Sequence, residues 1–593
     1  MRKLTAWALG FLLALGMAPG VALAEEKGWS VESASWQDQS NLVLTWQAQE
    51  GVTYEVYRSN TGEDAYEFIG TSSSGSYRDD EVWWPYTCFY KVRPVYASGE
   101  RGALSEPIES GENQQSVSKV TVLMYHNFIT EEDIQSGVEF EEYSLDPEDF
   151  REDLEYFREN GYTTITSADL IDYIDGKKPL PKKAVIVSID DGTWGVYKNC
   201  WPLLKEYGAK ADFNIIGENV DETWYLLRDG GSRDGQSAPY CTWEELVEMQ
   251  ESGEVNLCSH TYGLHRYNVD GRIGASMMEG ESVESYASLV AEDYRLSDSC
   301  IGGWTGVSPT TMAYPYSKRS TTTDEILLAS TGYQILMGGQ SARGTESNYF
   351  VDGASPESQL RIMSRPCRMD GHPAQEYLEA ADAADLATGA VAAEDTAGLT
   401  EEECAEIALW YSPFADVAGD AWYAGSAYYT YANSLISGTS PTTFSPEEVT
   451  SRAMVATVLY RMEGSPDISG GPTLSDVPAG SWYEQSMAWA AENGVITGVG
   501  DGRVQPERGI TREEMATVLY RYASARGVDT SVADSSLGVF NDADAVSSWA
   551  EDAVRWAVGE GILRGIEGGI APQNSLTRAE MATMLMRFSQ TSA

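Results

Sequence analysis

The last third of the chain repeats itself, and this repetition limits the possible fold more than any other feature of the sequence. Three segments, SRAMVATVLYR, TREEMATVLYR and TRAEMATMLMR, place apolar residues at helical spacing behind a serine or threonine in the N-cap position. An aspartate precedes the arginine of each segment by the same number of residues. Such self-similarity is typical of stacked copies of one small helical unit. The aspartates are Asp416, Asp476 and Asp542, and the arginines are Arg452, Arg512 and Arg578.

The first residues predict export. Arg2 and Lys3 precede an apolar run, and Ala22 and Ala24 form a small-x-small cleavage site, as in a secretory signal peptide. We therefore expect residues 1–24 to be a signal peptide. No later segment has the ~18 consecutive apolar residues that a membrane-spanning helix needs. The sequence predicts a secreted protein with no transmembrane segment.

The composition excludes some partners. The chain has 593 residues, enough for several domains, with 40 Lys and Arg against 91 Asp and Glu, a formal net charge of -51. Nucleic acids and anionic lipid headgroups would repel such a surface, so we expect no nucleic-acid partner. The seven cysteines include no C-x-x-C pair, which leaves zinc-finger and thioredoxin-type sites without support. Export permits disulfides, but the sequence assigns no pairing.

The segment after the signal peptide, residues 25–112, reads as all-β. NLVLTW, VTYEVYRS and CFYKVRPVY are short alternating runs separated by turn residues. Trp46 in an early strand and Tyr90 in a late one resemble the core of a fibronectin type III sandwich. We expect a β-sandwich in which these aromatic residues are core, and a role as a spacer or a weak carbohydrate contact.

The middle of the chain, residues 113–385, alternates predicted strands and helices, which is typical of a parallel sheet or barrel. Functional side chains in such folds gather at the carboxyl ends of the strands. His126 follows one apolar run, and Asp190 and Asp191 end the run VIVSIDD. Neighbouring side chains of a strand point to opposite faces, so both carboxylates can serve one site only where the backbone turns, at Gly192.

Two histidines follow another short apolar run. His260 and His265 lie in SHTYGLH, and on a helix a spacing of five would put them about 140° apart. They converge only if the chain between them is a loop, which Gly263 permits. Two imidazoles and a carboxylate form a recognised ligand set for a divalent metal and leave room for a water. Of the two aspartates, one would bind the metal and the other would accept a proton.

These motifs resemble those of the polysaccharide deacetylase (NodB homology) domain of carbohydrate esterase family 4. SIDDG stands for the aspartate motif of that family, SHTYGLH for its histidine motif, and AYPYS, residues 313–317, for its third motif. The histidine spacing, with LMYH upstream, is closest to the branch of poly-N-acetylglucosamine deacetylases. The resemblance implies a distorted (β/α)7 barrel and metal-dependent removal of N- or O-acetyl groups.

The resemblance also implies roles for individual residues. The bound ion would be divalent, with zinc expected and with cobalt, nickel or manganese also suited to the ligands. The matching residues are Asp191, His260 and His265 as metal ligands, Asp190 as general base, His126 as general acid and Tyr316 as the donor of a backbone N–H to the oxyanion.

Two positions depart from the family pattern. Ala313 replaces an arginine that orients the base in many members, and Ser317 replaces a glycine. Orientation of Asp190 must then come from elsewhere in the chain, with Arg361 or Arg365 as the candidates.

The C-terminal third resembles three S-layer homology repeats. The resemblance implies non-covalent attachment to a secondary cell-wall polymer of a Gram-positive-type wall. Arg452, Arg512 and Arg578 could bind the carboxylates of such a polymer in a bidentate way, or could instead cap or pair within each repeat. Met454 replaces a glutamate of the other two repeats, and Ala550 replaces a tyrosine.

We therefore expect a cell-wall-anchored, metal-dependent deacetylase of an N-acetylglucosamine-containing glycan. The alternatives are a wall-binding protein whose barrel has lost activity, an O-acetyl xylan or glycan esterase, and a glycoside hydrolase on the same barrel. A serine esterase is disfavoured because the sequence lacks G-x-S-x-G. The expected boundaries are 1–24 signal peptide, 25–112 fibronectin type III-like, 113–385 deacetylase, 386–410 linker, and all-α S-layer homology repeats at 411–466, 471–527 and 537–591.

Overall fold

The computed structural model describes residues 30–38, 41–59, 66–79, 88–110, 117–233, 239–339, 347–351, 354–388, 399–468, 474–531, 537–566 and 568–591. The expected signal peptide, residues 1–24, lies outside them. Contacts divide the chain into two compact units, one made of most of residues 1–111 and the other mainly of residues 112–593.

The N-terminal unit contains two sheets, of strand order β1-β2-β5 and β4-β3-β6-β7. Neighbouring strands of the second sheet are antiparallel, as are β2 and β5. Buried and half-buried residues alternate along β6, and both Trp46 and Tyr90 are buried. The strands are β1 (Val31–Asp38), β2 (Asn41–Trp46), β3 (Thr53–Ser59), β4 (Glu67–Ser72), β5 (Ser76–Asp79), β6 (Phe89–Val95) and β7 (Ile108–Glu109).

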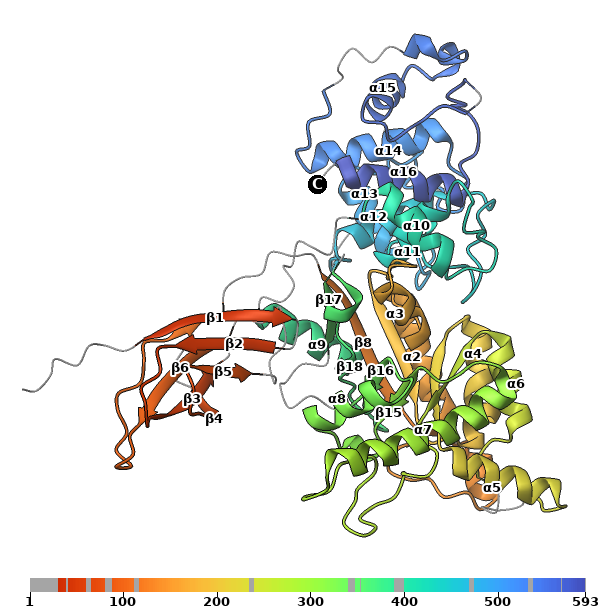
Figure 1. Ribbon diagram of the computed structural model, residues 1–593. Coiled ribbons are helices and arrows are strands. Elements are labelled where there is room, and N and C mark those ends of the chain that lie inside the picture. Colours follow the sequence, from red (N-terminus) through yellow and green to blue (C-terminus); the bar gives the residue numbers. More distant parts are fainter. Residues whose placement is uncertain are drawn as a thin grey trace, which may run out of the picture. The chain divides into compact units, whose positions relative to one another are not determined.

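The second unit is built around parallel strands in the order β8-β12-β13-β14-β15-β16-β18. Figure 1 labels β8, β15, β16 and β18 of this sheet among the surrounding helices. These strands are short and apolar, and β12, β13, β15 and β16 are buried along their whole length. This pattern is expected of a parallel sheet covered on both faces. The strands are β8 (Val117–Tyr125), β12 (Ala184–Ile189), β13 (Ala211–Ile215), β14 (Val255–Ser259), β15 (Thr311–Ala313), β16 (Ile335–Met337) and β18 (Ile362–Met363).

The chain that follows β18 closes the ring. Cys367 forms a parallel bridge with Met124 of β8, and the backbone N–H of Met124 donates to the carbonyl of Pro366. Two further strands extend the sheet, β17 (Ser347–Val351) antiparallel to β8 and β11 (Thr163–Thr164) parallel to β12. The result is a distorted barrel of seven parallel strands, as the family resemblance implies.

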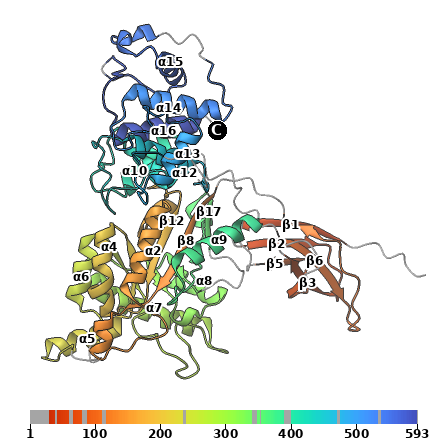
Figure 2. The ribbon, with the colours of Figure 1, turned by 180° about the vertical axis from the view of Figure 1, so that it is seen from behind.

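Helices surround the strands, and Figure 2 shows the same arrangement from behind. Asp146 caps the first long helix, which buries Phe150, Leu154 and Phe157, the face expected from the sequence. Other helices begin at Thr166, Thr242 and Ser320 caps. The helices are α1 (Glu131–Gln135), α2 (Pro147–Glu159), α3 (Ser167–Ile174), α4 (Trp201–Tyr207), α5 (Gly217–Arg228), α6 (Trp243–Ser252), α7 (Val283–Thr305), α8 (Thr321–Ser330) and α9 (Ala374–Thr388).

The C-terminal repeats are helical, and one hydrophobic cluster runs through all of them. Ser451, Thr511 and Thr577 accept hydrogen bonds from backbone N–H groups of the first helical turn, as expected of N-caps. The helices are α10 (Glu401–Tyr411), α11 (Ala424–Ala432), α12 (Arg452–Met462), α13 (Glu484–Glu492), α14 (Arg512–Ala525), α15 (Glu551–Gly559) and α16 (Arg578–Thr591).

The structure corrects the expected linker at 386–410. Helix α9 continues to Thr388, residues 389–398 lie outside the described residues, and α10 begins at Glu401. Thr400 and Glu403 form a capping box that starts α10, and Cys404, Ile407, Ala408 and Tyr411 are buried at helical spacing. A helix therefore occupies the second part of the expected linker, directly ahead of the repeat boundary predicted at 411.

The first repeat packs on the amino-terminal end of the barrel. The hydroxyl of Tyr431 donates to the carbonyl of Tyr162, before β11, over 2.7 Å. The backbone N–H of Lys182, before β12, donates to the hydroxyl of Tyr428 over 3.0 Å. Gly161 has φ of 71°, and a Cβ there would lie 2.5 Å from the carbonyl oxygen of Ala432. Side chains and backbone thus join the repeat closely to the barrel.

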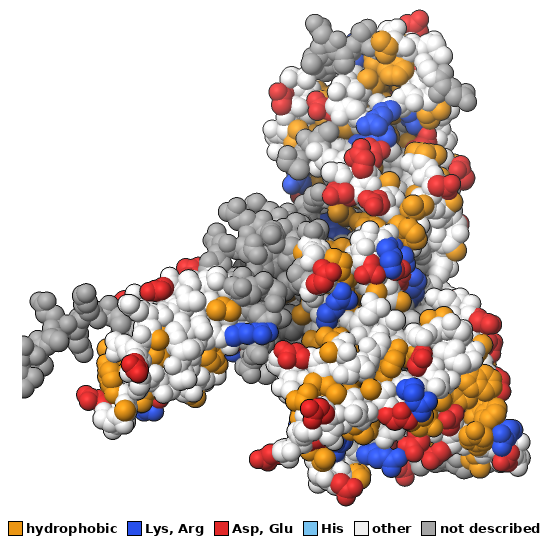
Figure 3. All heavy atoms as spheres, viewed as in Figure 1, with side chains coloured by type: hydrophobic (Ala, Val, Ile, Leu, Met, Phe, Trp, Pro, Cys, Tyr) orange, Lys and Arg blue, Asp and Glu red, His pale blue; other side chains and the backbone are white. Residues whose placement is uncertain are grey.

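The surface view in Figure 3 shows acidic side chains scattered among basic and hydrophobic ones over this face of the barrel and repeats. No helix within the described ranges is long and apolar enough to cross a membrane.

Candidate metal centre and active site

The site lies at the carboxyl ends of the barrel strands, where β12 ends in two aspartates. Asp191 and Gly192 both adopt left-handed backbone conformations, with φ of 78° and 85°. This turn is where the strand's alternation breaks, so that both carboxylates face the same group of residues. Asp190 is almost fully buried, whereas the side chain of Asp191 is 27% exposed.

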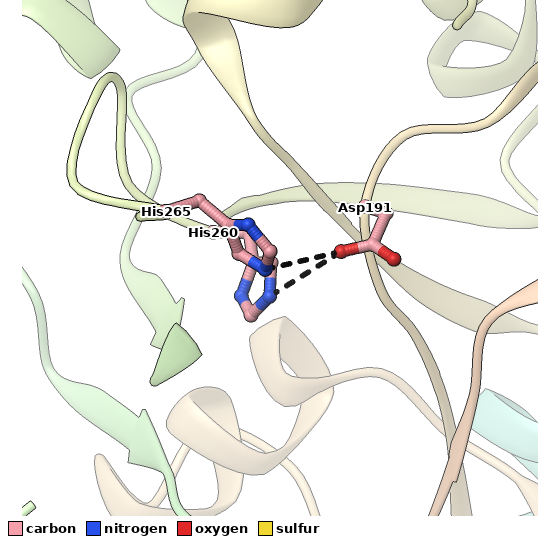
Figure 4. A group of neighbouring side chains, drawn as sticks. All are labelled: Asp191, His260 and His265. Carbon is pink, nitrogen blue, oxygen red and sulfur yellow. Dashed lines mark ion pairs between the residues drawn. The ribbon is translucent and has the colours of Figure 1, made fainter. Parts of the chain in front are cut away.

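Asp191, His260 and His265 come together as a candidate metal centre (Figure 4). Oδ1 of Asp191 lies 3.6 Å from Nε2 of His260 and 3.5 Å from Nε2 of His265. Ligands about 2.1 Å from a tetrahedral ion lie roughly 3.4 Å apart, so these separations suit a single small cation.

The environment of the histidines favours metal binding. Nδ1 of His260 lies 2.9 Å from the carbonyl oxygen of Ala313, which fixes the tautomer and leaves Nε2 as the free lone pair. Burial lowers the pKa of His260 to about 3 and also lowers the pKa of His265. Both rings are therefore neutral at physiological pH, which is the form that binds metal.

The surroundings of Asp191 disfavour its ionised form. Burial is the main cause that raises its pKa, to about 6, and the charge of Asp190 adds to the effect. A bound divalent ion would favour the ionised form. The donor set therefore fits a zinc-like ion with three protein ligands.

The loop that carries the two histidines is held from α7. Asp293 accepts hydrogen bonds from the backbone N–H groups of Tyr262 and Gly263, each over 3.0 Å. Thr261 takes a left-handed conformation with φ of 72°. The sequence pattern gave no signal for Asp293, which reads as an ordinary polar residue of a helix.

Asp190 is held by a buried ion pair with Arg365. The two guanidinium Nη atoms donate to the two carboxylate oxygens over 2.7 and 2.9 Å, and Asn214 donates to Oδ1 over 2.8 Å. Burial alone would raise the pKa of Asp190, but the charge of Arg365 outweighs it and the pKa is lowered. Arg361, the other candidate, instead donates to the carbonyl of Pro356.

His126 and Tyr316 also lie beside this group. The charge of His126 helps to lower the pKa of Asp190 and opposes the rise in that of Asp191, so it is within electrostatic reach of both carboxylates. The ring centre of Tyr316 is 4.7 Å from that of His265, and its backbone is left-handed with φ of 57°. The expected catalytic and metal-binding residues thus cluster, although they lie far apart in the sequence, between positions 126 and 316.

The three repeat arginines lie elsewhere and are 6% exposed or less. Each donates to two backbone carbonyls of another repeat, so that the first reaches the second, the second reaches the third and the third reaches the first. The acceptors are Val504 and Thr497 for Arg452, Ile570 and Arg564 for Arg512, and Phe444 and Ser437 for Arg578.

Comparison with known proteins gives the chain two assignments. The polysaccharide deacetylase family profile matches residues 177–336, and the S-layer homology domain matches residues 413–454, 473–516 and 539–582. The first range includes both aspartates, both loop histidines and Tyr316, but neither His126 nor Arg365.

Individual relatives match parts of the chain. The poly-beta-1,6-N-acetyl-D-glucosamine N-deacetylase of Escherichia coli K12 is 30% identical over 128 residues, 22% of this chain and 19% of that protein. The surface-layer 125 kDa protein of Lysinibacillus sphaericus is 29% identical over 160 residues, 26% of this chain and 13% of that protein. The match thus spans no more than about a fifth of the length of these curated relatives.

Among solved structures, a de-N-acetylase from Aggregatibacter actinomycetemcomitans is 22% identical, covering 44% of this chain and 99% of that one, with a TM-score of 0.36.

Proposed function

Because the chain carries a polysaccharide deacetylase domain and three S-layer homology repeats, we propose that it is a metal-dependent deacetylase held at a bacterial cell wall, with an N-acetylglucosamine-containing glycan as substrate. The observation that carries this proposal is the convergence of Asp191, His260 and His265 beside a second carboxylate, that of Asp190, which Arg365 holds. Zinc is the expected ion, with cobalt, nickel or manganese as alternatives.

A division of labour follows from the two environments. A divalent ion, when bound, acidifies a water and polarises an acetyl carbonyl. Asp190, kept ionised by Arg365 and free of metal-ligand duty, accepts the proton of the attacking water. His126 donates a proton to the departing nitrogen, and the backbone N–H of Tyr316 hydrogen-bonds the oxygen that gains charge.

The pair between Arg365 and Asp190 also weakens the alternative of a barrel that has lost activity. That alternative rested on Ala313, where many members carry the arginine that orients the base, and on Ser317, where they carry a glycine. Here Arg365, after β18, supplies a guanidinium to the same carboxylate.

The proposed location is the cell wall of a Gram-positive-type bacterium, with a secondary cell-wall polymer as partner. The repeats and their similarity to a surface-layer protein support this proposal. Residues 25–112 would serve as a fibronectin type III-like spacer, and residues 1–24 as the signal peptide.

Acetate release, with metal content measured in parallel, tests the proposed activity. The purified protein is given N-acetylglucosamine polymers, peptidoglycan and acetylated xylan, with and without a chelator. We expect chelator-sensitive acetate release from the N-acetylated glycans. Shortened chains with new reducing ends would instead indicate a glycoside hydrolase.

Two variants separate the roles of the aspartates. Asp191→Asn should lose metal and activity together, as should His260→Ala or His265→Ala. Asp190→Asn should keep near-stoichiometric metal while its kcat falls by about two orders of magnitude or more. Equal loss of metal from both aspartate variants, or full activity in Asp190→Asn, would contradict this assignment.

A further inference from the structure

Exposed aromatic rings stand next to the candidate metal centre. Tyr316 packs on His265 yet is 40% exposed. Tyr267 meets the ring of Tyr316 edge-on, with centres 5.4 Å apart, and is 68% exposed. Two tyrosine rings thus form a surface that continues outward from a metal-binding histidine.

This surface is held in place by the loop that follows His265. The backbone N–H of Gly274 donates to the carbonyl of Arg266, and Val269 and Arg272 form an antiparallel β-bridge. Gly274 lies so close to Pro315 that a Cβ there would be 2.7 Å from its carbonyl oxygen. The loop bearing Tyr267 is therefore packed against the turn that bears Tyr316.

A second exposed aromatic ring lies beside His126. The ring centre of Tyr143 is 5.0 Å from that of His126, and Tyr143 is 45% exposed. Ser144 follows it in β10 (Ser144–Leu145), which pairs with Asn127 of β9 (Asn127–Phe128). The strand pairing thus fixes Tyr143 next to the histidine.

The strand order places the two aromatic surfaces across the barrel from each other. Tyr143 accompanies His126, which follows β8, whereas Tyr316 follows β15. In a ring of seven strands, β15 is three steps from β8 through β18 and β16, and four steps in the other direction. The metal ligands lie between these surfaces, on the ends of β12 and β14.

The loop that bears Tyr143 is also acidic. Glu141 and Glu142 directly precede it, and the backbone N–H of Ser144 donates to the carbonyl of Glu141. Glu141 is among the charges that act on Asp191, after the larger effect of burial, so it is within electrostatic reach of the site. An anionic glycan would be repelled here, whereas neutral or amine-bearing sugars would not.

The chemistry of these surfaces suits sugar rings. The C–H face of a pyranose is apolar and packs on an aromatic face, while the tyrosine hydroxyl stays free for a sugar hydroxyl. Exposed apolar side chains grouped around a reactive centre mark a ligand surface rather than a random feature of a soluble protein.

We propose that the Tyr267–Tyr316 surface and Tyr143 hold the sugars on either side of the acetylated residue. The substrate is then an internal residue of a neutral or cationic glycan chain at least three sugars long. This inference rests on the proposed deacetylase function and adds the substrate class to it.

A length series tests the proposal. Acetate release is measured from oligomers of one to six N-acetylglucosamine units, in both the β-1,4-linked and the β-1,6-linked series. We expect kcat/KM to rise by at least about tenfold from the monomer to the trimer, with small changes beyond. Uronic-acid-containing oligomers should be poor substrates.

Substitutions assign the effect to the rings. Tyr267→Ala and Tyr143→Ala should each raise KM for the trimer about tenfold and should change kcat/KM for the monomer far less. Tyr267→Phe and Tyr143→Phe should retain the wild-type KM because stacking needs only the ring. Phe68→Ala, an exposed aromatic of the N-terminal unit, is the matched control.

The outcomes separate this inference from the function on which it rests. Equal kcat/KM for monomer and trimer, or alanine variants that affect both equally, would overturn the inference and leave the deacetylase intact. No acetate from any glycan would reject the proposed function and the inference with it.

Discussion

Arg365 keeps Asp190 ionised, and Asp190 is the carboxylate that is not a proposed metal ligand. Arg365 has no measurable exposure, and besides the two bonds to Asp190 it donates to the carbonyl of Gly338 and to Ser188. An ion pair so buried is held by its hydrogen bonds as much as by its charge. One arginine therefore fixes both the ionisation and the orientation of the proposed base.

Removing that guanidinium should be costly. In Arg365→Met we expect the free energy of unfolding to fall by about 3–5 kcal/mol, because a buried carboxylate loses its partner. We also expect kcat to fall by about two orders of magnitude or more, since the pKa of Asp190 would rise. Chemical denaturation and acetate release measure the two effects.

Two further variants make that result specific. Arg365→Lys keeps a charge but cannot form the bidentate contact, so it should recover stability better than activity. Arg361→Met, which removes a half-buried arginine that donates to the carbonyl of Pro356, should change activity little. Wild-type kcat in Arg365→Met would contradict the role of Arg365.

The residues that the sequence could identify are those with rare chemistry at fixed spacing. His260 and His265 are two of only four histidines in the chain, and the paired aspartates end a buried run. Arg365 could only be named as one of two candidates, because it lies 175 residues from Asp190 and no local pattern links them. Asp293 was missed for the same reason.

At the scale of elements, α7 matters because it holds the histidine loop. The carboxylate of Asp293 accepts two consecutive backbone N–H groups within that loop. It therefore acts on the metal centre without touching it, as residues behind metal ligands commonly do.

Loosening that anchor should weaken metal binding. Asp293→Ala is expected to lower metal affinity about 10- to 100-fold. The control is Glu292→Gln, an exposed neighbour whose carboxylate pairs with Arg295. Metal titration of the two variants checks this. Equal metal affinities would show that Asp293 is not needed to position the histidine loop.

The repeat helices present a different outcome for a sequence-based expectation. The arginines were expected either to bind a wall polymer or to cap or pair within each repeat, and their guanidinium groups donate to carbonyls of another repeat. Arg512 also pairs with Glu580 over 2.7 Å, whereas Met454 stands where the other two repeats have that glutamate. Within the described residues, no ion pair involves Arg578.

This difference predicts which arginine contributes to wall binding. Arg512→Gln and Arg578→Gln each lose two carbonyl bonds and should both lower the melting temperature. Of these two arginines, only Arg512 forms an ion pair among the described residues, so Arg578→Gln should weaken sedimentation with isolated walls more, by at least about threefold. Equal wall binding in both variants would return the arginines to a purely structural role.

At the scale of the molecule, the contact between the barrel and the first repeat differs from a flexible connection. The Ala-rich stretch at 380–398 is typical of a linker or a marginal helix, from which separable anchoring and catalysis would follow. Local composition could not reveal that Tyr428 and Tyr431 bond the barrel backbone, because these contacts join residues more than 240 positions apart.

Lys182, within this contact, predicts a dependence of stability on pH. Burial lowers its pKa to about 8, and the charge of Lys183 adds to the effect. Between pH 8 and ~10.4 the unfolded chain holds this proton and the folded chain does not, so the lysine makes stability rise with pH.

Comparing variants isolates that contribution. Lys182→Met should remove this rise and be more stable than the wild type near pH 7, where the buried charge is unfavourable. Lys205→Met, at an exposed lysine, is the control. Unfolding free energies measured from pH 7 to 10.5 would contradict the assignment if the Lys182→Met and wild-type curves were parallel.

Shortening the chain tests the same contact directly. A protein ending at residue 395 lacks α10 and α11. The backbone of Tyr162 and Lys182 would then lose its hydrogen bonds to Tyr431 and Tyr428. We expect its melting temperature to fall by several degrees relative to the full chain, with wall binding lost. An unchanged melting temperature, measured by calorimetry, would show that the barrel needs no repeat.

The repeat covers the amino-terminal end of the barrel, and the candidate metal centre lies at the opposite, carboxyl end. If the repeats grip a wall polymer, the reactive groups are held at a fixed height above that attachment. Glycan strands passing at that height would lose acetyl groups, and strands deeper or farther out would keep them. Acetylation would then be patterned by depth, as a property of one layer of the cell envelope.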